Sequence, residues 1–266
     1  MNSVVTGLLH AGHQVKILAV NSKKYHVTLK DIPEDYKKKT DIELIDVDLR
    51  VKPVKAFFNL FSRKSYHVER FISNKFTRRL IKALKADTYD VVQLETLYMA
   101  PYIGTIREHS KAMIVLRAHN VEHLIWERIA KGTRFFLKRA YINHLAKTLK
   151  NYELNVINNV DGIAAITSKD AARFRKHCAT PTIDIPYGVY PEEFTPNYEV
   201  ADKPQFYHIG SMNWTPNLEG IRWFINESLD AVVAKVPDFV FHLAGRNMPG
   251  WLTNLGNPHI DVIGEV

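Results

Sequence analysis

The sequence predicts an α/β protein with two domains, each built on a parallel sheet. Short, nearly continuous apolar runs alternate with helical patterns along the chain, as in parallel sheets whose strands are joined by crossover helices. A stretch with four prolines, residues 184–204, interrupts this alternation, and a new strand, turn and helix start follow it. The length of 266 residues, of which 46% are hydrophobic, allows two ordinary domains with buried cores.

The first domain is predicted over residues 1–184. A helical stripe closed by Gly12 precedes an apolar strand over residues 15–20, and an alternating pattern predicts a half-buried strand over 42–47. A doubly wound sheet normally places a strand and a glycine-rich turn before its first helix. The sequence starts directly with the helix, so we expect the first strand of this domain to be missing.

Residues 68–84 carry apolar side chains at every third or fourth position, which predicts one amphipathic helix with a basic outer face. Such a stripe is typical of a helix packed on a domain core. A basic amphipathic helix can also lie on an anionic membrane. Both interpretations stay open at this point.

Two apolar strands, over residues 90–94 and 113–116, flank a helical segment around residues 100–108. This order predicts a right-handed βαβ unit in a parallel sheet. Each strand ends in a polar cluster, Glu95-Thr96 after the first and residues 117–123 after the second. Because ligands of open parallel sheets bind beyond the carboxyl ends of the strands, both clusters are candidates for chemistry.

The remaining elements follow the same alternation. A long helix is expected over residues 135–157 and a strand over 161–167, with Ser168 as the cap of the next helix. After an interdomain hinge over residues 185–204, the second domain is predicted over 205–266. It contains a strand over 206–209, a helix with Thr215 as cap and Pro216 at its first position, and strands over 239–243 and 260–263.

The net charge of +8 is concentrated in the first half of the chain. Residues 50–85 and 128–150 are strongly basic, whereas acids predominate after residue 183. This asymmetry suits an anionic membrane, a phosphorylated acceptor or a nucleic acid, and equally a solvated helix face. The single cysteine, Cys178, excludes an intrachain disulfide and is typical of the cytoplasm.

Three motifs resemble glycosyltransferase family 4, whose members are nucleotide-sugar enzymes of the GT-B fold. They are Leu8-x-x-x-Gly12-His13-x-Val15, then Ile185-Pro186-x-Gly188-Val189 with Phe194-x-Pro196, and finally Gly210-Ser-Met-Asn-Trp-x-Pro-Asn217 with Trp223-Phe224 on the following helix. The last of these resembles a bacterial branch that assembles polysaccharides. The resemblance implies two Rossmann-like domains with parallel sheets.

The chain departs from the family pattern at several positions. Tyr187 and Tyr190 stand where Asn and Asp are common in the hinge, and Ser211 and Pro216 stand where the family usually has an Arg and a Lys. The acidic pair Glu-x7-Glu, which holds the nucleotide and the donor sugar in the family, is not reached before Val266. The resemblance therefore implies that the second domain is truncated and that this chain alone does not turn over a nucleotide sugar.

His119 and Glu122 are the candidate catalytic residues. Histidine can titrate near neutral pH or donate a hydrogen bond to a sugar hydroxyl, and a carboxylate can accept one. The position of His119 after its strand matches that of the family histidine that faces the donor sugar. A structural alternative is a helix start capped by Asn120, and Glu95 is a further candidate on the acceptor side. His119 and His123 have i, i+4 spacing, but no metal-ligand set accompanies them.

The candidate donor site follows the first strand of the second domain. Backbone N–H groups at a helix start, approached closely at a glycine, can hold a diphosphate. Trp223 on the same helix is expected to be a packing residue. The candidate donor-binding residues are Gly210, Ser211, Asn213, Trp214, Asn217 and Arg246. For Arg246, phosphate binding and an ordinary surface ion pair both remain open.

The resemblance implies an enzyme that moves a sugar from a nucleotide-sugar donor to a saccharide or a lipid-linked acceptor, with retention, in cell-surface polysaccharide or lipopolysaccharide synthesis. No metal or other cofactor and no nucleic acid partner is expected. We expect a cytoplasmic location with peripheral contact to an anionic membrane. The alternatives are a GT-B-like nucleotide-sugar 2-epimerase, or a non-catalytic basic protein that binds nucleic acid or membrane.

Overall fold

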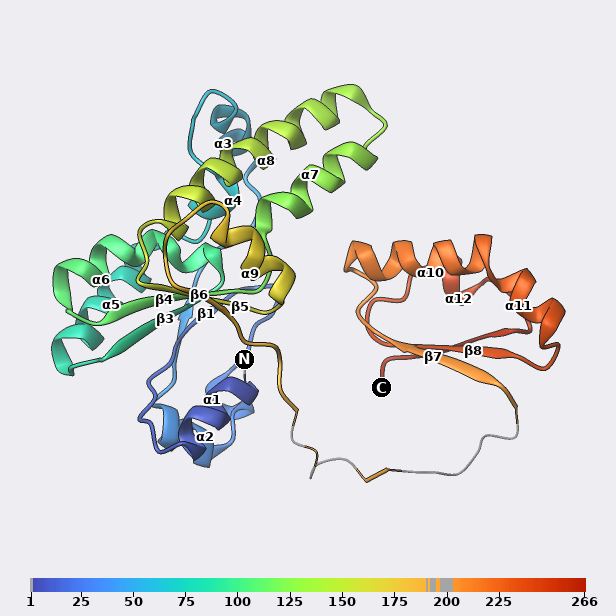
Figure 1. The fold of residues 1–266 in the computed structure, drawn as a ribbon, viewed down its shortest axis with the longest axis horizontal. Helices are drawn as coiled ribbons and strands as arrows, with labels where there is room; N and C mark the ends of the chain where they lie inside the picture. The colour runs from blue at the N-terminus through green and yellow to red at the C-terminus, as the bar shows by residue number, and fades with distance from the viewer. Residues whose placement is uncertain (1, 190, 192–194, 197–202) are drawn as a thin grey trace. The chain divides into compact units, whose positions relative to one another are not determined.

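The chain divides into two compact units, residues 1–190 and 191–266 (Figure 1). The computed structural model describes residues 2–189, 191, 195–196 and 203–266. Two residues of the predicted hinge motif, Tyr190 and Phe194, lie outside the described residues. Every strand pair in both units is parallel, as the apolar runs predict.

The first part of unit 1 contains a small two-stranded sheet. Helix α1 (Asn2–His10) is followed by β1 (Leu18–Asn21), the 3-10 turn η1 (Leu29–Asp31), α2 (Glu34–Thr40) and β2 (Glu43–Asp46). Strands β1 and β2 pair in parallel, with Leu18 opposite Glu43. The two strands expected over residues 15–20 and 42–47 are therefore confirmed.

The main sheet of unit 1 has the order β3-β4-β5-β6. Its strands are β3 (Val91–Glu95), β4 (Met113–Ala118), β5 (Gly162–Ala165) and β6 (Thr182–Asp184). The segments η2 (Leu97–Tyr102) and α6 (Ile103–His109) connect β3 to β4, and α9 (Ser168–Arg175) connects β5 to β6. Ile114, Leu116 and Ile163 are fully buried in the centre of this sheet, so their apolar runs form the core of the unit.

The amphipathic segment 68–84 forms two helices rather than the single one expected. They are α4 (Tyr66–Glu69) and α5 (Asn74–Ala86). The chain breaks between them because the Ser73 hydroxyl caps α5, accepting from the Phe76 amide, while the Ser73 amide donates to the Tyr102 hydroxyl. Phe76, Leu80 and Leu84 are buried in the main core. The apolar stripe of α5 is therefore core, which decides between the two interpretations of its sequence.

A helical extension covers one end of unit 1. It consists of α3 (Pro53–Asn59), α7 (Glu122–Gly132) and α8 (Phe136–Ile157), and α7 and α8 pack against each other (Figure 1). A small cluster of Ala56, Tyr66, Tyr141 and Leu145 joins α3 to α8. The cap of α9 is Thr167 and not Ser168, because the Thr167 hydroxyl accepts from the Asp170 amide.

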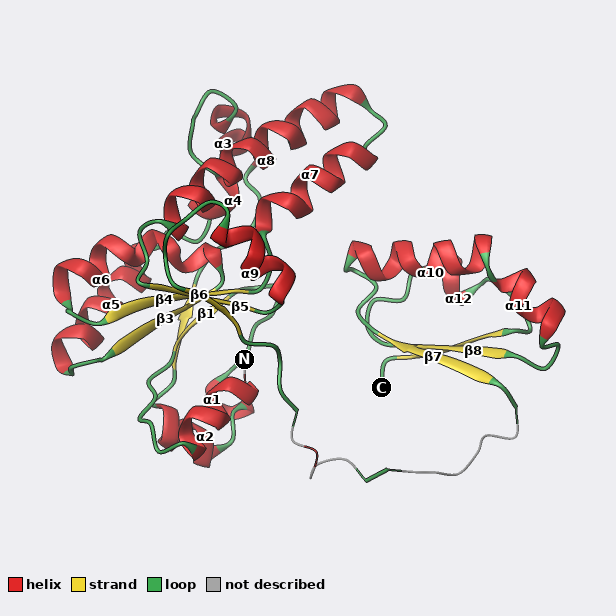
Figure 2. Ribbon diagram, viewed as in Figure 1, coloured by secondary structure: helices red, strands yellow, loops and turns green. Residues whose placement is uncertain are grey.

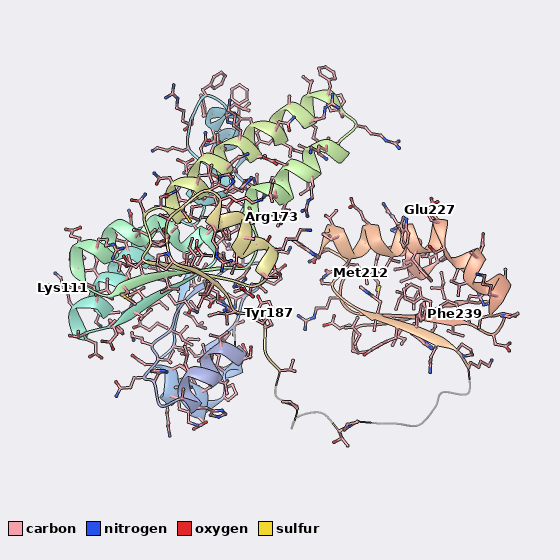
Figure 3. The ribbon with its side chains drawn as sticks, in the orientation of Figure 1. Lys111, Arg173, Tyr187, Met212, Glu227 and Phe239 are labelled. Atoms are coloured by element: carbon pink, nitrogen blue, oxygen red, sulfur yellow. The ribbon has the colours of Figure 1, made fainter. Side chains whose placement is uncertain are left out.

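Unit 2 is a three-stranded sheet of order β7-β8-β9 with its helices on one face (Figure 2). The strands are β7 (Gln205–Ile209), β8 (Val240–Ala244) and β9 (Ile260–Gly264). The helices are α10 (Thr215–Glu227), α11 (Leu229–Lys235) and α12 (Gly250–Thr253), and Met212 and Phe239 lie in the core beneath them (Figure 3).

Two expectations for α10 are wrong. Trp214 rather than Thr215 is the N-cap, so the helix begins one residue earlier, with Pro216 still in its first turn. Trp223 is exposed instead of packed. The reason is helical geometry: Ile221 faces the sheet, and two residues further the helix has turned by about 200°. Within the described residues, no helix combines the length and the apolar character needed to cross a membrane.

Candidate functional site

The ends of β3 and β4 bring His119 and Glu95 together. The two strands pair with Glu95 opposite Arg117, so His119 follows two residues beyond the last paired position. The imidazole Nε2 of His119 lies 2.7 Å from Glu95 Oε2. Both side chains are about three-quarters buried. The polar clusters predicted at the two strand ends thus form one site at the carboxyl edge of the sheet.

Arg117 and Tyr187 complete this group. Arg117 is 2% exposed, and its Nε lies 3.9 Å from Glu95 Oε1. Its guanidinium lies 5.5 Å from the centre of the Tyr187 ring, which is also 6.1 Å from the His119 ring. Tyr187 follows β6 and is half exposed (Figure 3). Tyr187 therefore forms the outer wall of the site.

Buried Arg117 also brings a hydrogen-bonding nitrogen to the site that the protein leaves unused. Its Nη2 is buried and has no hydrogen-bond partner among the described residues. A buried donor without an acceptor is costly, so this group favours an added anionic or carbonyl oxygen.

The charge state of Glu95 reflects a balance between burial and its neighbours. Burial raises the pKa of this carboxyl. Hydrogen bonds from His119 and Gln93, together with the charges of His119 and Arg117, lower the pKa by more than burial raises it. The net effect is a pKa below the ordinary glutamate value. Glu95 is therefore a carboxylate that accepts from His119 and orients its ring.

Glu122 lies deeper than His119. It is buried at the start of α7, and its carboxylate accepts a hydrogen bond of 2.9 Å from the Tyr98 hydroxyl. Burial raises the pKa of Glu122, and it raises the pKa of Tyr98 as well. Among the described contacts, the partner of His119 is Glu95 and not Glu122.

A carboxylate from another helix caps α7. Glu153 on α8 accepts from the amides of Glu122 (2.9 Å) and His123 (3.3 Å), and it also contacts His123 Nδ1. The N-cap position is Val121, which has no side-chain cap bond, so Asn120, the structural alternative from the sequence, is not the cap. Glu153 thereby holds the segment that carries His119 and Glu122.

Sequence reasoning missed Glu153, although a signal for it exists. The buried face of α8 contains Leu145, Leu149 and Val156, and Glu153 falls on the same stripe. A carboxylate on an apolar stripe must be paired inside the fold, because burial of an unpaired charge is too costly. Glu153 is only 2% exposed.

In unit 2 the turn between β7 and α10 is built on two glycines. A Cβ on Gly210 would lie 2.7 Å from Asn217 Nδ2, and one on Gly245 would lie 2.0 Å from the Gly210 carbonyl oxygen. Gly245 also has a φ of 126°. The Met212 amide donates to the Arg246 carbonyl, so the ends of β7 and β8 are joined at this point.

The other predicted donor-site residues surround the same turn. Asn217 Nδ2 donates to the Ser211 carbonyl, and the Ser211 hydroxyl donates to Asn213 Oδ1. Trp214 is exposed at the start of α10. Arg246 is largely exposed and forms an ion pair of 2.8 Å with Glu265. The structure thus brings Gly210, Ser211, Asn213 and Asn217 together in one turn. Arg246 is engaged in a surface ion pair with Glu265.

Parallel sheets with crossover helices in both units define a Rossmann-like fold of the GT-B type. A solved structure described as OtsA in its apo form matches over 99% of this chain and 70% of its own, with a TM-score of 0.51 and 12% identity. The α,α-trehalose 6-phosphate synthase from Burkholderia multivorans matches over 89% of this chain and 66% of its own, with a TM-score of 0.47 and 10% identity. No protein-family model and no curated protein sequence matches the chain.

Proposed function

We propose a nucleotide-sugar glycosyltransferase activity for this protein, with transfer of a sugar to a saccharide or a lipid-linked acceptor. The observation that carries the proposal is the Glu95–His119 pair at the carboxyl edge of the sheet in unit 1. Ligands bind at this edge in open parallel sheets. The fold shared with OtsA supports a GT-B glycosyltransferase, and the three sequence motifs favour family 4.

His119 is assigned the contact with the transferred sugar. Its Nε2 is paired with Glu95, which holds the imidazole ring in one orientation. Glu122 is assigned a supporting role in the same segment, because its carboxylate is buried against Tyr98. Arg117 supplies positive charge and an unused donor beneath the pair.

The turn before α10 is assigned the diphosphate of the donor. Gly210, Ser211, Asn213, Trp214 and Asn217 lie at the start of α10, where the helix dipole favours an anion. Arg246 joins them by exchanging Glu265 for a phosphate. On this assignment the leaving diphosphate is stabilised by dipoles and by Arg246, and transfer with retention needs no metal.

The test is donor consumption by the whole protein with a panel of nucleotide sugars. The His119→Ala variant is expected to lower turnover about a hundredfold or more, as removal of a positioned acid–base or hydrogen-bonding group does. His109→Ala, which changes a histidine on α6 away from the site, serves as the control. Unchanged turnover in His119→Ala removes this residue from the site, and a panel without any consumed donor contradicts the proposed activity.

A further inference from the structure

Helix α3 turns an aromatic face to the outside. Its small or polar residues Ala56 and Asn59 are buried on the side of α8, whereas Phe57 and Phe58 on the other side are exposed. Phe61, directly after the helix, is 80% exposed. Burial of phenylalanine is strongly favourable, so a fold that leaves three neighbouring rings in water indicates a surface made for contact.

These rings form one continuous patch. The centre of the Phe57 ring lies 5.8 Å from that of Phe58 and 5.8 Å from that of Phe61. Val54, one turn earlier on α3, is exposed as well. We call the four side chains Val54, Phe57, Phe58 and Phe61 the α3 surface.

Basic side chains surround the α3 surface. An open groove of about 590 Å³ lies beside it, and Phe58, Lys52, Lys55, Lys64 and Arg70 are among its lining residues. Its two acids are already engaged: Asp48 pairs with Arg50 and Lys52, and Glu69 accepts from Asn59. Lys55 and Lys64 have no ion-pair partner among the described residues.

The groove also contains unused polar atoms. Asn59 Oδ1 and Arg70 Nε are buried, and neither has a hydrogen-bond partner within the described ranges. The groove therefore combines free positive charge with an unsatisfied donor and acceptor next to exposed aromatic rings.

A second aromatic patch lies at the same end of unit 1. Phe135, Phe136 and Leu137 are exposed at the turn between α7 and α8, where Lys131, Arg134, Lys138 and Arg139 are also found. Tyr141, five residues along α8 from Phe136, packs in the cluster that holds α3. At 1.5 Å per residue these five residues span about 7.5 Å along α8. Figure 1 shows α3 and the α7–α8 turn in the upper part of unit 1.

We propose that the α3 surface docks this chain on an anionic lipid bilayer. Exposed aromatic side chains bordered by long basic side chains are the composition of a surface that inserts into the headgroup–acyl boundary. The rings enter the boundary, and the lysines stay at its surface and neutralise lipid phosphates. This binding is independent of the sugar-transfer reaction proposed above.

The basic helix α5 provides the contrast. It carries exposed Lys82 and Lys85, but its apolar side chains are buried in the core. Charge alone would favour α5 as the membrane helix, whereas the structure exposes clustered aromatic side chains at α3 and at the α7–α8 turn.

The experiment is vesicle co-sedimentation of the 266-residue chain. Phosphatidylcholine vesicles with 30% phosphatidylglycerol, and vesicles of phosphatidylcholine alone, are compared at 50 mM and 500 mM NaCl. We expect binding to the anionic vesicles at low salt and at least a tenfold loss in Phe57→Gln/Phe61→Gln. Lys55→Gln/Lys64→Gln is expected to lose about fivefold per lysine. The control Lys82→Gln/Lys85→Gln retains at least half of the wild-type affinity.

Two results overturn the proposal. One is binding of Phe57→Gln/Phe61→Gln equal to that of the wild type, with circular dichroism showing both folded. The other is absence of binding to anionic vesicles. In that case the α3 surface could instead pair two copies of the chain, and sedimentation velocity would detect a dimer that the phenylalanine variant loses. If the phenylalanine variant does not fold, the lysine pair decides by the same criterion.

Discussion

Glu153 Oε1 accepts the backbone amide of Glu122 at 2.9 Å, so a buried carboxylate of α8 holds the first turn of α7. The two residues are 31 positions apart in the sequence. Their contact ties the long helix of the extension to the segment that follows β4 and contains His119. The geometry of the candidate site therefore depends on a residue outside it.

We expect Glu153→Ala to destabilise unit 1 by about 3–5 kcal/mol, because it leaves His123 and two amides without their buried acceptor. Urea unfolding followed by circular dichroism measures this loss. The matched control is Glu127→Gln, which removes an exposed ion pair with Lys150 and is expected to cost at most about 1 kcal/mol. Equal effects of the two changes would contradict the capping role.

Glu95→Gln is expected to lower turnover in the same donor-consumption assay. The amide keeps the size of the side chain, but it loses the negative charge that orients and stabilises His119. Turnover is expected to fall because the imidazole ring is no longer held by a charged acceptor, and donor consumption measures the loss. Glu108→Gln, an exposed change on α6, is the control. A parallel drop in the control would attribute the effect to surface charge.

Stability should fall as the pH is lowered through the range in which His67 titrates. Burial, with a contribution from the Arg70 charge, lowers the pKa of His67 to about 4, against about 6.5 in the unfolded chain. The unfolded state therefore binds the proton first, and stability is full above about pH 6.5 and declines as the pH falls toward 4, by about 3 kcal/mol at most.

The measurement for His67 is the free energy of unfolding at pH 7.5 and at pH 5. His67→Phe preserves the ring contact with Trp126, whose centre lies 4.0 Å away, and should flatten this pH dependence. His26→Phe changes an exposed histidine and should leave it unchanged. An unaltered slope in His67→Phe would assign the pH dependence to other groups.

Gly245→Ala should destabilise unit 2 by several kcal/mol, because the new methyl group would lie 2.0 Å from a backbone oxygen at a φ of 126°. Tryptophan fluorescence reports this unit well, since Trp214, Trp223 and Trp251 all belong to it. Gly220→Ala within α10 meets no atom within 4 Å and is expected to stabilise by about 0.5–1 kcal/mol. Opposite signs for the two substitutions are the expected result.

Local patterns were sufficient for most of the fold. The apolar runs predicted strands β3, β4, β8 and β9 within a residue or two of their observed ends, because short apolar runs bounded by polar residues are typical of strands in a parallel sheet. Patterns failed where a distant contact ended an element. The break before α5 depends on the hydroxyl of Tyr102, which a window over residues 68–84 does not contain.

The candidate site shows the same division. Strand ends and residue types were enough to select His119, Glu95 and the turn from Gly210 to Asn217, because chemistry in parallel sheets lies at the carboxyl edge. The register of β3 and β4 decided which carboxylate pairs with His119. It places Glu95 beside the ring, rather than the sequence neighbour Glu122.

By itself, then, the sequence determined the α/β class, the parallel strands and the edge at which polar side chains gather, since these follow from periodicity and chain order. Only the tertiary structure decided that Glu153 caps α7, that Tyr187 covers Arg117, and that α3 rather than α5 exposes its apolar face. The physical reason is that burial belongs to a side chain's three-dimensional neighbours. The same basic and aromatic residues form a core or a free surface according to which segment packs against them.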